Sequence, residues 1–173
     1  MNFWFQKKSQ PPEPGRYSPS GITHIGDILT ESTILRVSPA IEKTSIIDSL
    51  IAKMSEAHKI LNKEELTAKI HEREQGISTT LDTGLSIPHA RIDNLNELVA
   101  GLALLPQGIK DSHQSLPTIR LMFLFLSPNK REFYPQHLQI LRKAASLFQN
   151  DFIEELNLAS PSEALQLIRA KGL

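Results

Sequence analysis

Residues 119–126 read Ile-Arg-Leu-Met-Phe-Leu-Phe-Leu, an almost unbroken apolar run that is one strand long. Residues 98–105 are also apolar at nearly every position. A strand with one face in solvent alternates apolar and polar side chains, whereas a strand covered on both faces does not need to. We therefore expect two strands at the centre of a sheet that is buried on both sides.

Segments with helical spacing lie on either side of these strands in the sequence. Residues 42–57 repeat apolar side chains at helical intervals, namely Ile46, Ile47, Leu50, Ile51 and Met54. Asn62, which precedes three charged residues, predicts the N-cap of a second helix that ends near Gln75. Short strands are expected at 33–37 and 84–87.

The C-terminal third is predicted to be helical. Residues 132–149 place one apolar face on a helix, formed by Leu138, Leu141, Ala145 and Phe148. Ser160-Pro161-Ser162-Glu163 predicts a capping box that opens a last helix to about Ala170. Because helices alternate with buried strands, we expect a single-domain α/β sandwich with helices on both faces of the sheet.

The chain of 173 residues fits one domain. Four prolines within residues 9–21 disfavour helix and strand, so residues 1–24 are predicted to be a flexible tail and residues 25–173 the folded domain. The tail carries Phe3, Trp4 and Phe5 beside two lysines, a combination found at membrane surfaces. We favour a tail without membrane contact, because termini are commonly disordered.

Charge and composition narrow the class of protein. Lysine plus arginine total 19 and aspartate plus glutamate total 19, so the chain has no overall basic charge that would predict nucleic-acid binding. The absence of cysteine excludes disulfides and thiolate metal sites. No apolar run reaches the ~20 residues that span a bilayer, and the N-terminus does not resemble a signal peptide. We expect a cytoplasmic protein.

The segment most relevant to chemistry is Thr83-Gly84-Leu85-Ser86-Ile87-Pro88-His89-Ala90-Arg91. Proline has no N–H, so Pro88 is expected to stop a short strand and leave His89 exposed at its end. Neutral imidazole is abundant at pH 7 because its reference pKa is ~6.5, and it can attack phosphorus without a strong base. Taken alone, a Pro-His pair at a strand end is more often structural than catalytic.

This segment resembles the active-site signature of enzyme IIA (EIIA) domains of the bacterial sugar phosphotransferase system, in their type-2 class, which includes fructose/mannitol and nitrogen-regulatory members. Further segments are similar to that family in the same order, namely 70–74 with 78–79, 99–103, 119–128 and 137–141. The resemblance covers roughly residues 25–171. It implies the fold of mannitol-specific EIIA, a mixed β-sheet flanked by helices on both faces.

The resemblance also implies roles for particular residues. His89 would accept the phosphoryl group, through Nε2, while its other nitrogen donates to a backbone carbonyl or a carboxylate. His137, near the start of a helix, would donate an N–H to the phosphate, and Arg73 would hold phosphate oxygens. Thr79 is equally expected to donate a hydroxyl to the phosphate or to cap a turn. Arg91 is a candidate for binding phosphate or a partner, although a solvated charge is favoured.

One residue departs from the family pattern. The family usually has glycine after the phosphorylated histidine, whereas this chain has Ala90. If glycine is needed there for a positive φ, alanine would be strained. If glycine is needed only for space, alanine can serve.

The resemblance implies a phosphotransferase component without a cofactor or a metal ion. The remaining histidines lack the His-x-x-x-His spacing of a helical metal site, and we read them as surface residues: His24, His58, His71 and His113. The implied donor is an HPr-like phosphocarrier protein, and the implied acceptor is an enzyme IIB (EIIB) or a regulated target protein. Because the sequence has no fused EIIB, EIIC or carrier domain, a nitrogen-type regulatory role is favoured. A sugar-specific EIIA and a non-catalytic binding scaffold are the alternatives.

Overall fold

A computed structural model of the chain describes residues 21, 24–38, 41–60, 62–111 and 118–172. The predicted tail, residues 1–24, lies outside the described residues except for Gly21 and His24, as does His113. The first described element is a 3-10 helix, Ile25–Asp27, where the domain is predicted to start.

A single mixed sheet forms the centre of the fold. Its strands are β1 (Ile34–Arg36), β2 (Leu85–Ser86), β3 (His89–Ile92), β4 (Val99–Ile109) and β5 (Ile119–Pro128). Strands β4 and β5 are antiparallel and lie in the middle, and β1 runs parallel to β4 on one side. On the other side, β2 and β3 both run parallel to β5, one after the other along its edge.

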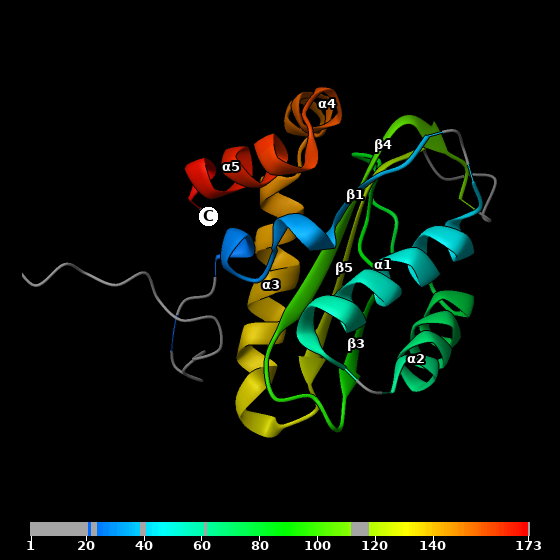
Figure 1. Cartoon of the computed structure of the whole chain (residues 1–173), viewed down its shortest axis with the longest axis vertical. Coiled ribbons are helices and arrows are strands. Elements are labelled where there is room, and N and C mark those ends of the chain that lie inside the picture. Colours follow the sequence, from blue (N-terminus) through cyan, green and yellow to red (C-terminus); the bar gives the residue numbers. More distant parts are fainter. Residues whose placement is uncertain (1–20, 22–23, 39–40, 61, 112–117, 173) are drawn as a thin grey trace, which may run out of the picture.

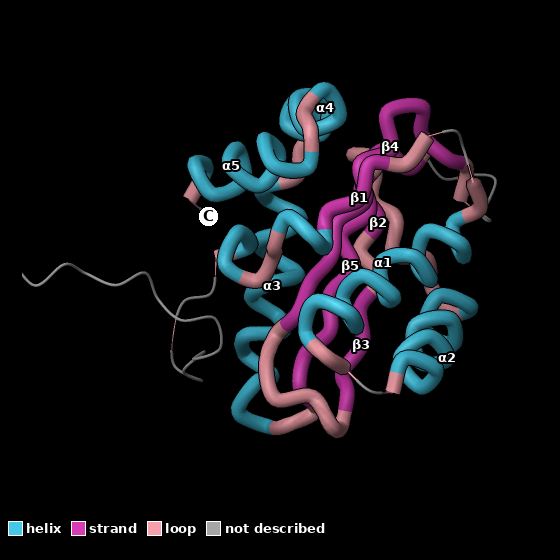
Figure 2. Tube along the Cα trace, viewed as in Figure 1, coloured by secondary structure: helices cyan, strands magenta, loops and turns pink. Residues whose placement is uncertain are grey.

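Helices cover both faces of this sheet, as Figures 1 and 2 show. Helices α1 (Lys43–His58) and α2 (Lys63–Gln75) lie on one face. Helices α3 (Tyr134–Leu147), α4 (Asn150–Leu158) and α5 (Pro161–Lys171) lie on the other. The expected α/β sandwich with helices on both faces is confirmed.

The central strands contribute side chains to two separate cores. On β5, Leu121, Phe123 and Phe125 pack towards α3, α4 and α5. The intervening residues Met122, Leu124 and Leu126 pack towards α1 and α2. Since successive side chains of a strand point to opposite faces, an unbroken apolar run is what two cores require. The prediction of two-sided burial from residues 119–126 is confirmed.

The prediction for the helix at 132–149 has the wrong buried face. The structure has a 3-10 turn at Arg131–Phe133 followed by α3, whose buried residues are Gln136, His137, Ile140, Ala144 and Leu147. The predicted Leu138 is 43% exposed instead. An apolar pattern missed the true face because two of its members are polar. The short helix α4 was also not predicted.

The predicted starts of two helices can be compared with the structure. Ser160 forms the capping box: its Oγ accepts a hydrogen bond from the Glu163 N–H at 3.3 Å, and Glu163 accepts one from the Ser160 N–H at 2.8 Å. Asn62 occupies the N-cap of α2 as predicted, but its side chain makes no capping hydrogen bond.

Candidate active site

His89 is the first residue of β3, directly opposite Phe125 of β5. The expectation that Pro88 ends the strand is therefore only half right. Pro88 cannot donate a hydrogen bond, but its carbonyl accepts one from the Phe125 N–H at 3.1 Å. This bond keeps the chain beside β5, so pairing resumes at His89 and holds that residue within the sheet.

A backbone carbonyl fixes the imidazole of His89. Its Nδ1 lies 2.7 Å from the carbonyl oxygen of Ile87. A carbonyl can only accept, so Nδ1 carries the hydrogen and Nε2 of the neutral ring has a free lone pair. The ring also stacks on Phe125, with centroids 5.6 Å apart and planes 11° apart.

Burial lowers the pKa of His89, while its hydrogen bond to Ile87 acts in the opposite direction. The charge of Arg73 lowers that pKa further, and the charge of Glu74 raises it. The downward shift keeps the ring neutral at pH 7 and its Nε2 lone pair available.

A second neutral imidazole lies beside the first. His137, in the first turn of α3, is 6% exposed, and its ring centroid lies 5.5 Å from that of His89. Burial lowers the pKa of His137 to about 4, and the charges of His89 and Arg91 act in the same direction. The sequence predicted a neutral ring because of the helix N-terminus, whereas burial is the main cause in the structure.

Two arginines act on the histidine pair. Arg73 lies in the last turn of α2, close enough to affect His89, and its Nη1 donates to the carbonyl of Ile77 at 3.0 Å. Arg91 follows His89 by two residues on β3 and acts on His137. The site therefore combines two neutral imidazoles with two permanent cations, an arrangement suited to an anion.

Arg91 is not the solvated charge that the sequence favoured. Its guanidinium lies 5.1 Å from the centroid of the Tyr134 ring, and its Nη2 donates to the carbonyl of Lys130 at 3.3 Å. These contacts hold a cation beside His137.

Thr79 supports the site from below. Its hydroxyl donates to Glu74 Oε1 at 2.8 Å, and its carbonyl accepts from the N–H of Ile87 at 3.0 Å. The expectation of a hydroxyl bonded to phosphate does not match this arrangement, because the hydrogen is already donated to a carboxylate. Thr79 instead holds the peptide whose carbonyl orients His89.

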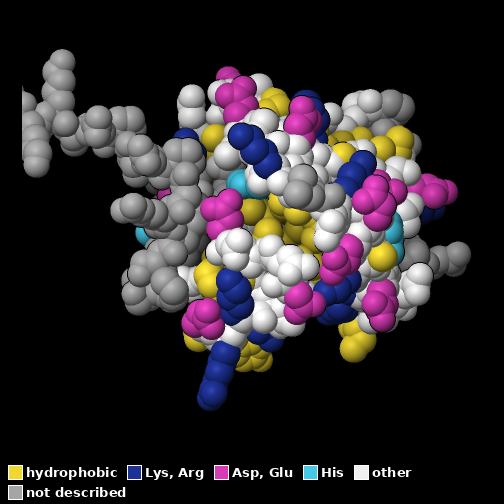
Figure 3. Space-filling model, turned by 60° about the horizontal axis from the view of Figure 1, so that its bottom comes forward, with side chains coloured by type: hydrophobic (Ala, Val, Ile, Leu, Met, Phe, Trp, Pro, Cys, Tyr) yellow, Lys and Arg dark blue, Asp and Glu magenta, His cyan; other side chains and the backbone are white. Residues whose placement is uncertain are grey.

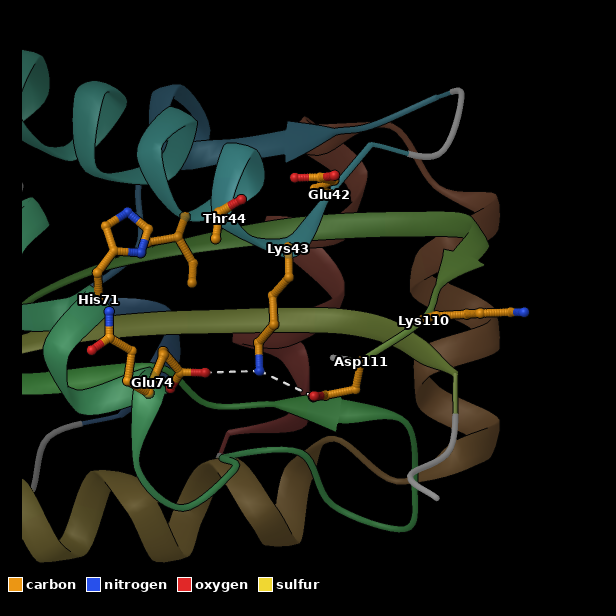
Figure 4. A pocket seen from close by; sticks show the side chains of 9 residues that line it. Glu42, Lys43, Thr44, His71, Glu74, Lys110 and Asp111 are labelled. Atoms are coloured by element: carbon orange, nitrogen blue, oxygen red, sulfur yellow. Dashed lines mark hydrogen bonds and ion pairs between the residues drawn. The ribbon is translucent and has the colours of Figure 1, made fainter. Parts of the chain in front are cut away.

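A buried ionic cluster, missed from the sequence, supports that segment (Figure 4). Lys43 Nζ lies 2.7 Å from Glu74 Oε2 and 3.1 Å from Asp111 Oδ2. Asp111 also accepts hydrogen bonds from Ser78 and Thr80. The cluster borders a cleft of about 790 Å³. Lys43 is the first residue of α1, where the helix dipole disfavours a cation, and this position was the available signal of a nearby acid.

Ala90 adopts the conformation of an ordinary strand residue. Within the described ranges, Lys59 is the only non-glycine residue with a positive φ. Ala90 lies in β3, and its methyl group packs against the core beneath α1 and α2. Glycine is therefore not needed for backbone conformation at this position.

Other kinds of site were also considered. In the part of the chain that the structure describes, no three His, Asp or Glu side chains are grouped to hold a metal ion. Among the same residues, no helix has the length and apolar character that crossing a membrane requires. On the face seen in Figure 3, basic and acidic side chains are interspersed around a small apolar hollow.

Comparison with known proteins identifies what the chain is similar to. The family model described as "Phosphoenolpyruvate-dependent sugar phosphotransferase system, EIIA 2" matches residues 27–171. The chain is 26% identical over 151 residues to the PTS system fructose-specific EIIA component of Haloferax volcanii, covering 87% of this chain and 97% of that protein.

Two solved structures have the same fold. The nitrogen regulatory protein IIA-Ntr from Neisseria meningitidis superposes with a TM-score of 0.72 at 24% identity, covering 83% of this chain and 98% of that one. The Escherichia coli mannitol IIA, solved in complex with phosphorylated mannitol IIB, gives a TM-score of 0.64 at 18% identity, covering 82% and 97%.

The buried cluster generates a stability prediction. Lys43→Met removes the cation between two buried carboxylates, which should lower the free energy of unfolding by about 3–5 kcal/mol. Urea denaturation at pH 7 measures this change. Lys53→Met, on the same helix, is the matched control: Lys53 is half-exposed and 4.0 Å from Glu56, so its loss should be below about 1 kcal/mol. Equal losses in the two variants would contradict the role given to Lys43.

The low pKa of His137 generates a pH prediction. Its ring protons should titrate near pH 4 in an NMR titration. Unfolded His137 binds a proton below about pH 6.5, while the folded ring does so only near pH 4, so acid favours the unfolded chain. The free energy of unfolding should therefore fall between pH 6.5 and 4, and it should fall less steeply in His137→Gln. A ring that titrates near pH 6.5 would show that His137 is not buried as described.

Proposed function

The chain belongs to the EIIA type-2 family of the phosphoenolpyruvate-dependent sugar phosphotransferase system, and we propose that it carries the phosphoryl group on Nε2 of His89. The observation that supports this proposal is the 2.7 Å contact between His89 Nδ1 and the carbonyl of Ile87. It leaves Nε2 as the nitrogen with a lone pair, in a ring that burial keeps neutral.

The chemical step needs no external base. The lone pair on Nε2 attacks the phosphorus of a phosphohistidine on an HPr-like carrier. The carrier's P–N bond breaks and its electron pair returns to the carrier's ring, while the new N–P bond forms in line. The Nδ1 hydrogen of His89 stays on the Ile87 carbonyl throughout. The protein therefore contributes mainly positioning and charge compensation.

Neighbouring side chains compensate the charge of the phosphoryl oxygens. Arg73 uses one guanidinium N–H for the Ile77 carbonyl and has others for the incoming group. His137, neutral and beside His89, donates its free ring N–H to a second oxygen. Arg91 adds a positive charge near His137 without leaving its contact with Tyr134.

The proposed acceptor is an EIIB protein of a sugar-specific system, and the exchange is proposed to occur in the cytoplasm. The curated relative from Haloferax volcanii is described as fructose-specific, and the mannitol IIA structure is a complex with its IIB. Exposed apolar side chains beside the two arginines offer contact area to a partner: Ile77, Tyr134 and Leu138. The regulatory role favoured from the sequence is not confirmed, because the likeness to IIA-Ntr extends to the fold alone.

Labelling tests the proposal. Incubation with a phosphorylated HPr-like carrier should add one acid-labile phosphoryl group to the intact protein, and His89→Ala should acquire none. Label that persists in His89→Ala would overturn the assignment, and an unlabelled wild-type protein under efficient donor conditions would favour a non-catalytic scaffold. Transfer from the labelled protein to a sugar-specific EIIB supports uptake, whereas retention with every EIIB tested would favour regulation.

The role of Arg73 can be measured in the same assay. Arg73→Ala should slow labelling by about 100-fold, because charge-assisted hydrogen bonds to phosphate are worth roughly 2–3 kcal/mol. Its thermal unfolding should stay close to that of the wild type, since the side chain makes one exposed hydrogen bond. Arg142→Ala, on the exposed side of α3, is the matched control and should label at the normal rate. Equal rates for the two variants would remove Arg73 from the mechanism.

A further inference from the structure

Ser127 is a buried polar residue beside the histidine pair that the proposed chemistry has not used. It lies near the end of β5, opposite Arg91 of β3, and it is 0% exposed. Its Oγ lies 2.7 Å from Nδ1 of His137. This is a short hydrogen bond between two buried groups, and its direction determines which nitrogen of His137 carries the hydrogen.

The surroundings of Ser127 settle the direction of this bond. A hydroxyl has one hydrogen to donate, and a buried donor without an acceptor costs about 1–3 kcal/mol. Within the described residues, the only hydrogen-bond partner of the Ser127 side chain is His137 Nδ1. If Nδ1 were protonated, it would donate to Oγ and the hydroxyl hydrogen would have no acceptor. The bond is satisfied when Ser127 donates and Nδ1 accepts.

We propose that Ser127 is a positioning residue: its hydroxyl donates to Nδ1 of His137 and so keeps the hydrogen of that neutral ring on Nε2, as a donor to the phosphoryl group on His89. This inference rests on the proposed function of His89. Ser127 does not touch the phosphoryl group and acts only through His137.

The two rings then have opposite tautomers. His89 donates through Nδ1 to the Ile87 carbonyl and presents a lone pair at Nε2. His137 accepts at Nδ1 from Ser127 and presents an N–H at Nε2. The first ring is prepared as a nucleophile and the second as a hydrogen-bond donor. With the other tautomer, His137 would direct a lone pair at phosphoryl oxygens, which are themselves only acceptors.

Long-range ¹H–¹⁵N NMR of the full chain, ¹⁵N-labelled at histidine, tests the tautomer directly at pH 7. The wild-type protein should show protonated Nε2 and unprotonated Nδ1 at His137, and the reverse pattern at His89. In Ser127→Ala the His137 signals should move towards a mixture of tautomers, because nothing then fixes the ring. A wild-type His137 with protonated Nδ1 overturns the inference.

Labelling by the phosphorylated carrier adds a functional readout. Ser127→Ala should label at His89 about tenfold more slowly, and Ser127→Thr, which retains a hydroxyl, should recover most of that loss. Ser55→Ala is the matched control, because it removes a buried hydroxyl of α1 that has no hydrogen-bond partner. A normal rate in Ser127→Ala overturns the inference.

The outcomes separate this inference from the function on which it rests. If the wild type accepts no label, the proposed function fails, while the tautomer measurement still stands. If the wild type is labelled and Ser127→Ala keeps both the rate and the Nε2 hydrogen, only the role of Ser127 fails. Should Ser127→Ala not fold, the wild-type tautomer and Ser127→Thr decide the question.

Discussion

The candidate site depends on the hydrogen bond between Nδ1 of His89 and the carbonyl of Ile87. One carbonyl oxygen, two residues earlier in the chain, fixes both the orientation of the ring and the nitrogen that remains unprotonated. A side chain in solution exchanges between tautomers and rotamers, whereas this ring is held by its own backbone and by the stacked Phe125. Much of the fold can be understood as keeping that carbonyl in place.

Several layers contribute to this support. The Ile87 N–H is bonded to Thr79, and the side chains of residues 78–80 are bonded to Glu74 and Asp111. Lys43 joins the two carboxylates from the start of α1. Elements that are distant in the sequence, namely α1, α2 and the end of β4, thus meet behind one loop. The geometry of His89 is therefore coupled to the packing of a whole face of the sheet.

Local patterns predicted most of the fold. The unbroken apolar runs at 98–105 and 119–126 predicted strands covered on both faces, and the Ser160 capping box predicted the start of α5. The buried face of α3 was predicted wrongly because Gln136 and His137 are polar residues on it. The partnership of Lys43 with Glu74 and Asp111 was out of reach, since it joins three elements and no local periodicity reports such contacts. The contact between Ser127 and His137 was missed for the same reason.

The central claim concerns which nitrogen of His89 bears the phosphoryl group. It is tested most directly by NMR of the phosphorylated protein, in which ¹⁵N shifts and ³¹P couplings distinguish the two ring positions. The account predicts a phosphoryl group on Nε2, with Nδ1 still protonated and bonded to the Ile87 carbonyl. A phosphoryl group on Nδ1 would mean that this hydrogen bond breaks before transfer, and it would contradict the account.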